Sequence, residues 1–211
     1  MDLILFGMQG SGKGTQSKYL ATFAHLQVFE TGAQLRRLAQ EESELGQKVK
    51  SIIESGNLVP TEVVMEIISN FIHHLPEGKN ALFDGIPRSK DQQEQFDALL
   101  KKENREFKCL NIKISEEEAL KRLTTRRLCK KCKAVYPAFY AKETCETCGG
   151  ELETRRDDTP DAIRVRIDTF LEKTQPVIDD YDSRGLMLTV NGEQSIEDVT
   201  KDSVEAIKPY F

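Results

Sequence analysis

The sequence predicts an α/β fold in which a parallel sheet is flanked by helices. Short apolar runs, which are typical of buried strands, occur at residues 3–6, 81–83, 110–114 and 186–190. Longer stretches with apolar residues at helical spacing lie between them, as at 16–26 and 163–171. Strands that alternate with helices in this way form a parallel sheet with both faces covered, which makes three layers.

The composition indicates one globular unit. A chain of 211 residues buries roughly 70% of its unfolded surface, which is enough for a core with inserted subdomains. The formal net charge of −5 argues against a protein that coats nucleic acid or an anionic membrane. The apolar run that begins the chain ends at Gly7 and is too short for a signal peptide or a membrane span. We therefore expect a soluble, cytoplasmic monomer that acts on neither nucleic acid nor membranes.

The segment Gly7–Thr15 joins the first predicted strand to a predicted helix. In this context glycines let successive backbone N–H groups converge on phosphate oxygens at the positive end of the helix, as in a P-loop. The general motif has Ser or Thr directly after its lysine, but here Gly14 separates Lys13 from Thr15. This departure favours a monophosphate kinase over a generic nucleotide hydrolase. The expected phosphate-binding residues are Gly10, Ser11, Gly12, Lys13, Gly14 and Thr15.

Four cysteines form two closely spaced pairs. Two residues separate Cys129 from Cys132 and Cys145 from Cys148, and twelve residues separate the pairs. This spacing suits four thiolates around a tetrahedral zinc ion, and with no open coordination position evident the ion is expected to be structural. Spacing alone leaves a redox or iron site open. Flanking arginines also leave open a zinc-ribbon module that binds nucleic acid, although the acidic net charge argues against it.

Further motifs follow in order along nearly the whole chain. They are Thr31-Gly32, Leu35-Arg36, Asn57-Leu58-Val59, Asp84-Gly85-Ile86-Pro87-Arg88, Gln92, Arg122, Arg126-Arg127, Arg155 and Arg166. Together with the loop, these residues resemble the motifs of the adenylate kinase family, including its members with a four-cysteine lid. The resemblance implies a P-loop core at 1–29, 60–121 and 159–211, a helical AMP-binding insertion at 30–59 and a small zinc-binding lid at 122–158.

The resemblance implies the reversible conversion of ATP and AMP into two ADP by in-line transfer, with magnesium bound to ATP and the lid closed over the site. Planar arginines such as Arg36 and Arg88 suit the phosphate of AMP, and the Gln92 amide suits its adenine edge. The residues expected around AMP are Thr31, Arg36, Asn57, Leu58, Val59, Gly85, Ile86, Pro87, Arg88, Gln92, Arg155 and Arg166.

On the ATP side, the resemblance places Arg122 over the adenine, with Val135, Tyr136 and Gln194 completing the base pocket. Because a transferring phosphoryl group spreads negative charge over its oxygens, positioned cations suffice for catalysis. The expected catalytic residues are Lys13, Arg88, Arg126, Arg155 and Arg166, and Asp84 is expected to hold magnesium through water.

Ala33 departs from the family pattern, because a second Asp is usual at its position, and we expect weaker magnesium coordination as a result. Arg127 and Arg156 are candidates to pair with Asp157 and Asp158 and so latch the lid. Another acceptor monophosphate or GTP as donor is the alternative within the same class.

Overall fold

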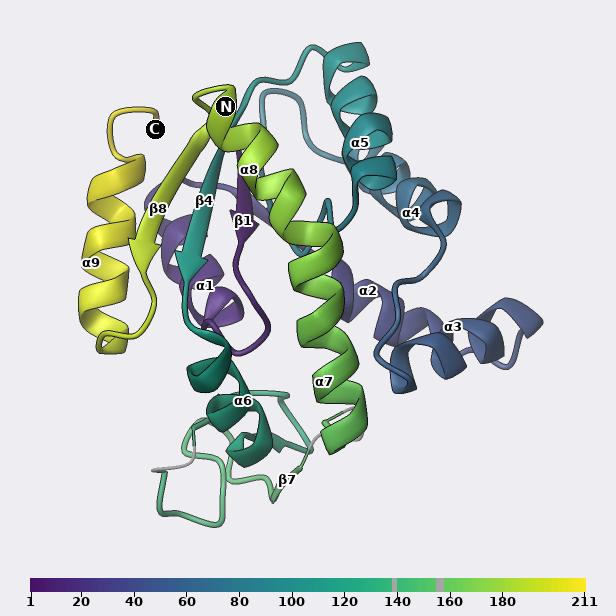
Figure 1. The fold of residues 1–211 in the computed structure, drawn as a ribbon, viewed down its shortest axis with the longest axis vertical. Coiled ribbons are helices and arrows are strands. Elements are labelled where there is room, and N and C mark those ends of the chain that lie inside the picture. Colours follow the sequence, from purple (N-terminus) through teal and green to yellow (C-terminus); the bar gives the residue numbers. More distant parts are fainter. Residues whose placement is uncertain (138–139, 155–157) are drawn as a thin grey trace.

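In the computed structural model, which describes residues 1–137, 140–154 and 158–211, five parallel strands form one sheet (Figure 1). The order across the sheet is β2-β3-β1-β4-β8, with bounds Gln27–Glu30, Ala81–Asp84, Asp2–Phe6, Phe107–Lys113 and Met187–Asn191. Four of these strands correspond to the predicted apolar runs. The edge strand β2 was not predicted, because Phe29 is its one fully buried residue.

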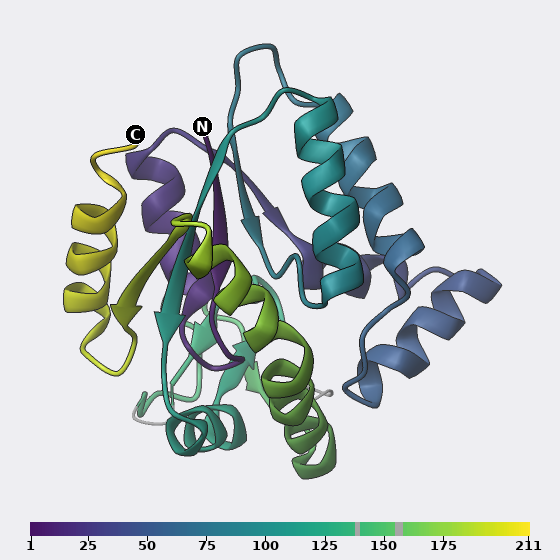
Figure 2. The same ribbon diagram turned by 45° about the horizontal axis from the view of Figure 1, so that its top comes forward.

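Side chains of the sheet alternate between two apolar cores, one on each face. Leu3 and Leu5 of β1 belong to one core with residues of α1 (Lys13–Phe23) and α9 (Ile196–Ile207). Ile4 and Phe6 belong to the other core, which is covered by α4 (Thr61–His73), α5 (Lys90–Lys102), α7 (Pro160–Thr169) and α8 (Gln175–Ser183). Figure 2 shows the two helical layers on opposite faces of the sheet. The predicted three-layer α/β fold is confirmed.

Two short helices, α2 (Thr31–Leu38) and α3 (Glu44–Glu54), lie between β2 and α4 and project from the side of the molecule (Figure 1). The Ser43 hydroxyl caps α3 by accepting a hydrogen bond from Gly46 N–H. At the other end, backbone bonds from Gly56 to Ile53 and from Asn57 to Ile52 close the helix. The segment is therefore helical, as expected for residues 30–59.

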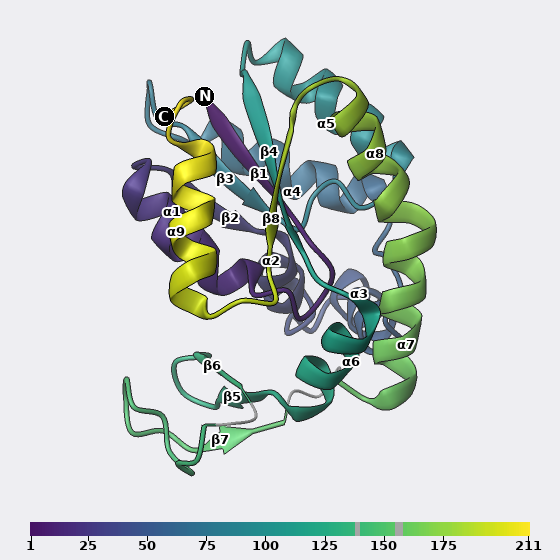
Figure 3. The same ribbon diagram turned by 60° about the vertical axis from the view of Figure 1, so that its left-hand side comes forward.

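A second excursion from the core begins with α6 (Glu116–Thr125), which Ser115 caps. It continues into a small antiparallel sheet of β5 (Arg127–Cys129), β6 (Val135–Tyr136) and β7 (Leu152–Glu153) in the order β6-β5-β7. Figure 3 shows this sheet beyond α6, at the end of the molecule toward which the core strands run. The chain returns through α7, which passes into α8 by a π-helical turn, η1 (Phe170–Thr174).

The loops after the parallel core strands meet at one end of the sheet, the position at which α/β proteins bind ligands. In particular, Leu5 of β1 is paired with Asp84 of β3, so the loops that follow these strands begin side by side. Across the described residues, no helix combines the length and the apolar character needed to cross a membrane.

Candidate active site

The glycine-rich loop leaves β1 after Phe6 and enters α1 at Lys13. Gly7 has φ +145°, and a Cβ there would lie 2.5 Å from Ser11 Oγ and 2.6 Å from Ile112 O, so a side chain does not fit. Lys13 Nζ donates to Gly7 O at 2.5 Å and to Met8 O at 3.1 Å, and so folds back over the loop. Ser11 is buried, and its hydroxyl has no hydrogen-bond partner among the described residues.

Lys13 faces a carboxylate on the neighbouring strand. Burial lowers the pKa of Lys13 to about 8, although the charge of Asp84 opposes the change. Burial likewise raises the pKa of Asp84, and the charge of Lys13 opposes it. Arg88 and Arg126 also act on Lys13 electrostatically, and their positive charges lower its pKa further. The positive side chains that we expected at the donor nucleotide, Lys13 and Arg126, and at the acceptor nucleotide, Arg88, therefore lie near one another.

Arg88 lies just beyond β3, in a turn that fixes both its backbone and its side chain. Its N–H donates to Gln92 Oε1 at 2.8 Å, and its carbonyl accepts from Thr174 Oγ1 at 2.8 Å. Its Nε donates to Gly85 O at 2.9 Å. Gly85 has φ +84°, and a Cβ there would lie 2.7 Å from Arg88 Nη2. The turn thus holds the guanidinium against the backbone of its own loop, and the Gln92 carbonyl oxygen is committed to that turn.

The other residues expected around AMP occupy α2 and the segment before α4. Thr31 begins α2 and is buried, and its hydroxyl has no partner among the described residues. Arg36 donates to Glu30 at 3.0 Å and is partly exposed. Asn57 Nδ2 donates to Ser55 Oγ at 3.0 Å. Leu58 is partly buried and Val59 fully buried beside Asn57, while Ile86 and Pro87 are buried in the Arg88 turn.

Asp158 joins two of the predicted catalytic arginines. Its Oδ2 accepts from Arg126 Nε at 2.5 Å, and its Oδ1 accepts from Arg126 Nη2 at 2.8 Å and from Arg166 Nη2 at 2.6 Å. Burial alone would raise the Asp158 pKa, but the hydrogen bonds and charges of the two arginines outweigh it and hold the pKa below its usual range. Arg155, which we also expected here, lies outside the described residues.

The sequence suggested that Arg127 and Arg156 pair with Asp157 and Asp158, and the described residues show other partners for Arg127 and Asp158. Asp158 binds Arg126 and Arg166, whereas Arg127 lies 3.8 Å from Glu143 and donates to the carbonyl of Tyr140. Arg127 is therefore not paired with Asp158, because its contacts lie in the segment between β6 and β7, whereas Arg126 contacts Asp158 just before α7. Arg156 and Asp157 lie outside the described residues.

The residues expected around the ATP base are more widely placed. Arg122 is bound to Glu118 at 2.7 Å and donates to Gly10 O at 3.4 Å, which brings it to the phosphate loop. Gln194 donates to Asp202 at 2.8 Å on the exposed side of β8 and α9. Val135 is 56% exposed, whereas the Tyr136 side chain is turned into the cysteine cluster and is buried.

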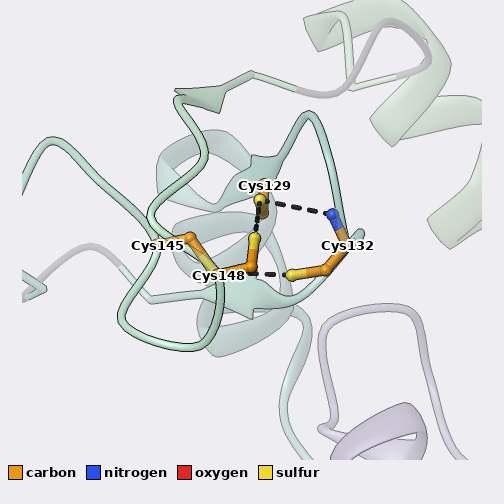
Figure 4. Close-up of side chains that lie close together, drawn as sticks. All are labelled: Cys129, Cys132, Cys145 and Cys148. Atoms are coloured by element: carbon orange, nitrogen blue, oxygen red, sulfur yellow. Dashed lines mark hydrogen bonds between the residues drawn. The ribbon is translucent and has the colours of Figure 1, made fainter.

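The four cysteines of the two pairs meet at one point. Their sulfur atoms all lie within 4.8 Å of one another, with Cys129 Sγ 3.5 Å from Cys148 Sγ and Cys132 Sγ 3.4 Å from Cys145 Sγ. Figure 4 shows the side chains converging from the two turns. Tetrahedral zinc with bonds of about 2.3 Å needs sulfurs roughly 3.8 Å apart, so this set fits the ion.

The fold and loop define the class of the protein first. A glycine-rich loop that leaves a central parallel strand and opens a helix binds nucleotide phosphates, and the convergence of arginines opposite it suits phosphoryl transfer. The chain is in this respect a P-loop α/β protein.

Comparison with known proteins narrows the class. A family model described as adenylate kinase matches residues 5–186. The chain is 39% identical over 212 residues to an adenylate kinase of Archaeoglobus fulgidus, covering 98% of this chain and 97% of that one. It is 38% identical to one of Caldicellulosiruptor bescii and 34% to one of Staphylococcus aureus, each covering 98% of this chain and 99% of the relative. The chain belongs to the adenylate kinase family and is thus a nucleoside monophosphate kinase.

Sequence reasoning missed several residues that organise this site. Asp158 was expected only as a lid latch, and Thr174 and Gln9 were not expected at all; Gln9 Oε1 is buried without a partner among the described residues. Gln9 belongs to the loop motif and could have been found there. Thr174 could not, because it is 86 residues from the Arg88 carbonyl that it binds.

Proposed function

We propose that the protein transfers the γ-phosphoryl group of magnesium-bound ATP to AMP, reversibly, and so forms two ADP. The observation that carries this proposal is the convergence of Lys13 and Arg88 beside Asp84, at the carboxyl ends of the adjacent parallel strands β1 and β3. Lys13 lies at the end of the proposed donor loop, and Arg88 lies in the proposed acceptor turn. A phosphoryl group in transfer from ATP to AMP would lie between these two cations.

The donor phosphates are proposed to bind the loop from Gly10 to Thr15. Ser11 Oγ supports this, because a buried hydroxyl without a partner among the described residues costs free energy that a phosphate oxygen would recover. Arg122 reaches the loop at Gly10 O and is proposed to cover the ATP adenine from there. Val135 and Gln194, with the backbone of Tyr136, are proposed to complete the base pocket.

The acceptor phosphate is proposed to bind Arg36 and Arg88, with the unpartnered buried hydroxyl of Thr31 beside them. The structure sharpens the proposed role of Gln92. Because its Oε1 accepts from Arg88 N–H, its Nε2 amide is the group left to meet an acceptor on the adenine edge. The backbone from Asn57 to Val59 is proposed to close the other side of the AMP base, and the turn of Gly85, Ile86 and Pro87 is proposed to lie below it.

The transfer step needs position and charge more than covalent chemistry. An oxygen of the AMP phosphate forms a bond to the γ-phosphorus, and the bond from that phosphorus to the oxygen bridging it to the β-phosphate breaks, which leaves ADP on both sides. Lys13, Arg88, Arg126 and Arg166 are proposed to stabilise the charge on the transferring oxygens. Arg155, outside the described residues, is proposed to act with them.

Asp84 is proposed to hold magnesium through water when MgATP binds. The buried carboxylate and its position beside Lys13 fit this role, since a dication would favour its charged form. When bound, the ion neutralises phosphate charge and orients the phosphates. Ala33 leaves Asp84 without the second carboxylate usual in the family, so Ala33→Asp should tighten magnesium binding, and an unchanged apparent affinity would contradict this.

The segment 122–158 is proposed to act as a lid and 30–59 as the AMP-binding insertion, both closing on the core at 1–29, 60–121 and 159–211 to exclude water. The cysteines are proposed to hold structural zinc. Among the described residues of this segment, only Cys129, Tyr136 and Cys145 form a buried cluster, so an ion would supply stability that so small a core cannot. Thiols in this arrangement suit a reducing compartment, and we propose a cytoplasmic monomer.

A product assay tests the reaction. The protein is mixed with magnesium, ATP and AMP, and then with CMP, GMP or UMP in place of AMP and with GTP in place of ATP. We expect ADP to form from ATP and AMP only. Efficient use of another monophosphate would keep the enzyme class and overturn the choice of acceptor, whereas oligonucleotide binding without turnover would favour the zinc-ribbon alternative.

Two neighbouring arginines of α2 provide a matched pair. Arg36→Ala should raise KM for AMP about 10- to 100-fold, the range for a lost hydrogen bond to a charged group. Arg37→Ala removes the same charge from an exposed side chain and should change KM less than about twofold.

Arg88→Ala should lower kcat about 100-fold or more without unfolding the protein. Near-normal turnover in Arg88→Ala would refute its role.

A further inference from the structure

We propose that the phenol of Tyr136 is an outer-sphere hydrogen-bond donor to the metal site, in which it binds the Cys145 sulfur and strengthens metal binding. This inference rests on the proposed zinc ion. The Tyr136 Oη lies 3.0 Å from Cys145 Sγ. We expected Tyr136 near the ATP base, and its side chain packs in a buried cluster with Cys129 and Cys145.

The direction of this hydrogen bond follows from a second contact. Glu146 N–H donates to the same Tyr136 Oη at 3.1 Å. The backbone N–H can only donate, so the phenol oxygen accepts from it and keeps its own proton for another partner. A metal-bound cysteine is a thiolate and can only accept. The chain Glu146 N–H to Tyr136 O–H to Cys145 Sγ therefore runs one way.

The phenol is also held in place by its surroundings. The Tyr136 side chain is 4% exposed, and its ring centroid lies 4.3 Å from that of Tyr140. Its backbone is paired with that of Arg127 on β5, and the same strand carries Cys129. A buried, pre-positioned donor loses little entropy when it binds a thiolate, so its hydrogen bond contributes more than that of a mobile surface group.

The chemistry of the site explains why such a donor helps. Four thiolates around one dication carry a net negative charge, and each donor to a sulfur reduces it. Cys129 Sγ receives backbone N–H groups of Lys131 and Cys132, both at 3.4 Å. Those donors cannot be removed by changing a side chain. Tyr136 is a side-chain donor, so a single substitution isolates its contribution.

The test compares Tyr136→Phe with Tyr140→Phe. Both variants keep the two adjacent rings, but the Tyr140 phenol donates to the carbonyl of Thr144 at 2.9 Å and not to sulfur. Zinc affinity is measured by competition with a chromophoric chelator, and cobalt is substituted to record the thiolate-to-metal charge-transfer band. Neither tyrosine belongs to the five-stranded core, so we expect that core to stay folded in both variants. Circular dichroism checks this.

We expect Tyr136→Phe to weaken zinc binding about 10- to 100-fold, as is usual when an outer-sphere partner is lost, and to shift the cobalt band to lower energy. Tyr140→Phe should change affinity less than about threefold and leave the band in place. Equal affinity in Tyr136→Phe and the unmodified chain would overturn the inference alone, as would equal losses in both variants. An unmodified chain that binds no zinc would overturn the proposed metal as well.

Discussion

Replacing Asp158 with Asn should destabilise the protein, because this one carboxylate holds two largely buried arginines. Its side chain is fully buried, and those of Arg126 and Arg166 are 15% and 10% exposed. Asn has nearly the same shape as Asp, so packing is preserved and the charge and one acceptor are lost. The change therefore isolates the electrostatic part of the contact.

The magnitude follows from the contacts. If the Asn oxygen takes the place of Oδ1, it keeps the bonds at 2.8 Å and 2.6 Å, but the amide nitrogen then faces Arg126 Nε, another donor, across 2.5 Å. The opposite orientation loses two bonds. At least one charge-assisted hydrogen bond is lost, which alone costs about 1.5–3 kcal/mol. Breaking a fully buried ion pair costs about 3–5 kcal/mol in all, and the partial exposure of both arginines moves the expected loss toward the lower end of that range. We expect a loss of about 2–4 kcal/mol, which lowers Tm by roughly 5–15 °C.

Thermal and urea denaturation at neutral pH measure this loss, with Asp182→Asn as the control, since Asp182 is an exposed aspartate of α8. The loss should also depend on pH. Because the folded pKa of Asp158 lies below its unfolded value of about 3.9, its contribution is fully present above that pH and disappears as pH falls through the folded pKa. Equal stability of Asp158→Asn and Asp182→Asn at pH 7 would refute the reasoning.

Three further outcomes are expected. Burial lowers the pKa of Lys13 to about 8, so ATP affinity measured by titration should fall as pH rises above about 8, and a constant affinity would contradict a role for the ammonium. Thr174→Val removes the bond to the Arg88 carbonyl and should raise KM for AMP about 2- to 10-fold while KM for ATP holds; Thr174→Ser should restore it, and failure to do so would leave only a packing role. Gly56→Ala places a Cβ 2.6 Å from a main-chain oxygen of α7 at φ +82°, whereas Gly78 has φ +71° and open space; denaturation should show a loss of about 1–3 kcal/mol beyond that of Gly78→Ala.

Local patterns explain which parts of the fold could be predicted. The strand runs around Leu3 and Leu82 are continuous and apolar because both faces of these central strands are covered. Those around Leu110 and Leu188 are interrupted by Asn111, Lys113 and Thr189 but keep enough apolar residues to be recognised. Strand β2 lies at the edge, where Gln27 and Glu30 are exposed, and carries too weak a pattern to be recognised. The boundaries of the proposed lid and AMP-binding insertion remain predictions.

The candidate site divides in the same way. The phosphate loop and each of the two cysteine pairs are short, local motifs in the sequence. Their spacing alone therefore indicates phosphate binding and tetrahedral sulfur ligation. The orientation of a side chain is not encoded in spacing. Tyr136 was expected beside a base, and the structure shows that its phenol faces sulfur. Gln92 was expected to bind adenine, and it uses one of its two polar groups to hold the Arg88 turn.

By itself, the sequence determined the fold class, the phosphate loop and the family resemblance, because each depends on residues that lie next to one another or repeat at a regular interval. Only the tertiary structure decided which charged and polar groups contact one another. Asp158 meets Arg126 across 32 residues, and Thr174 meets Arg88 across 86. Such contacts depend on how strands and helices stack, and burial then sets the pKa of Lys13 and Asp84.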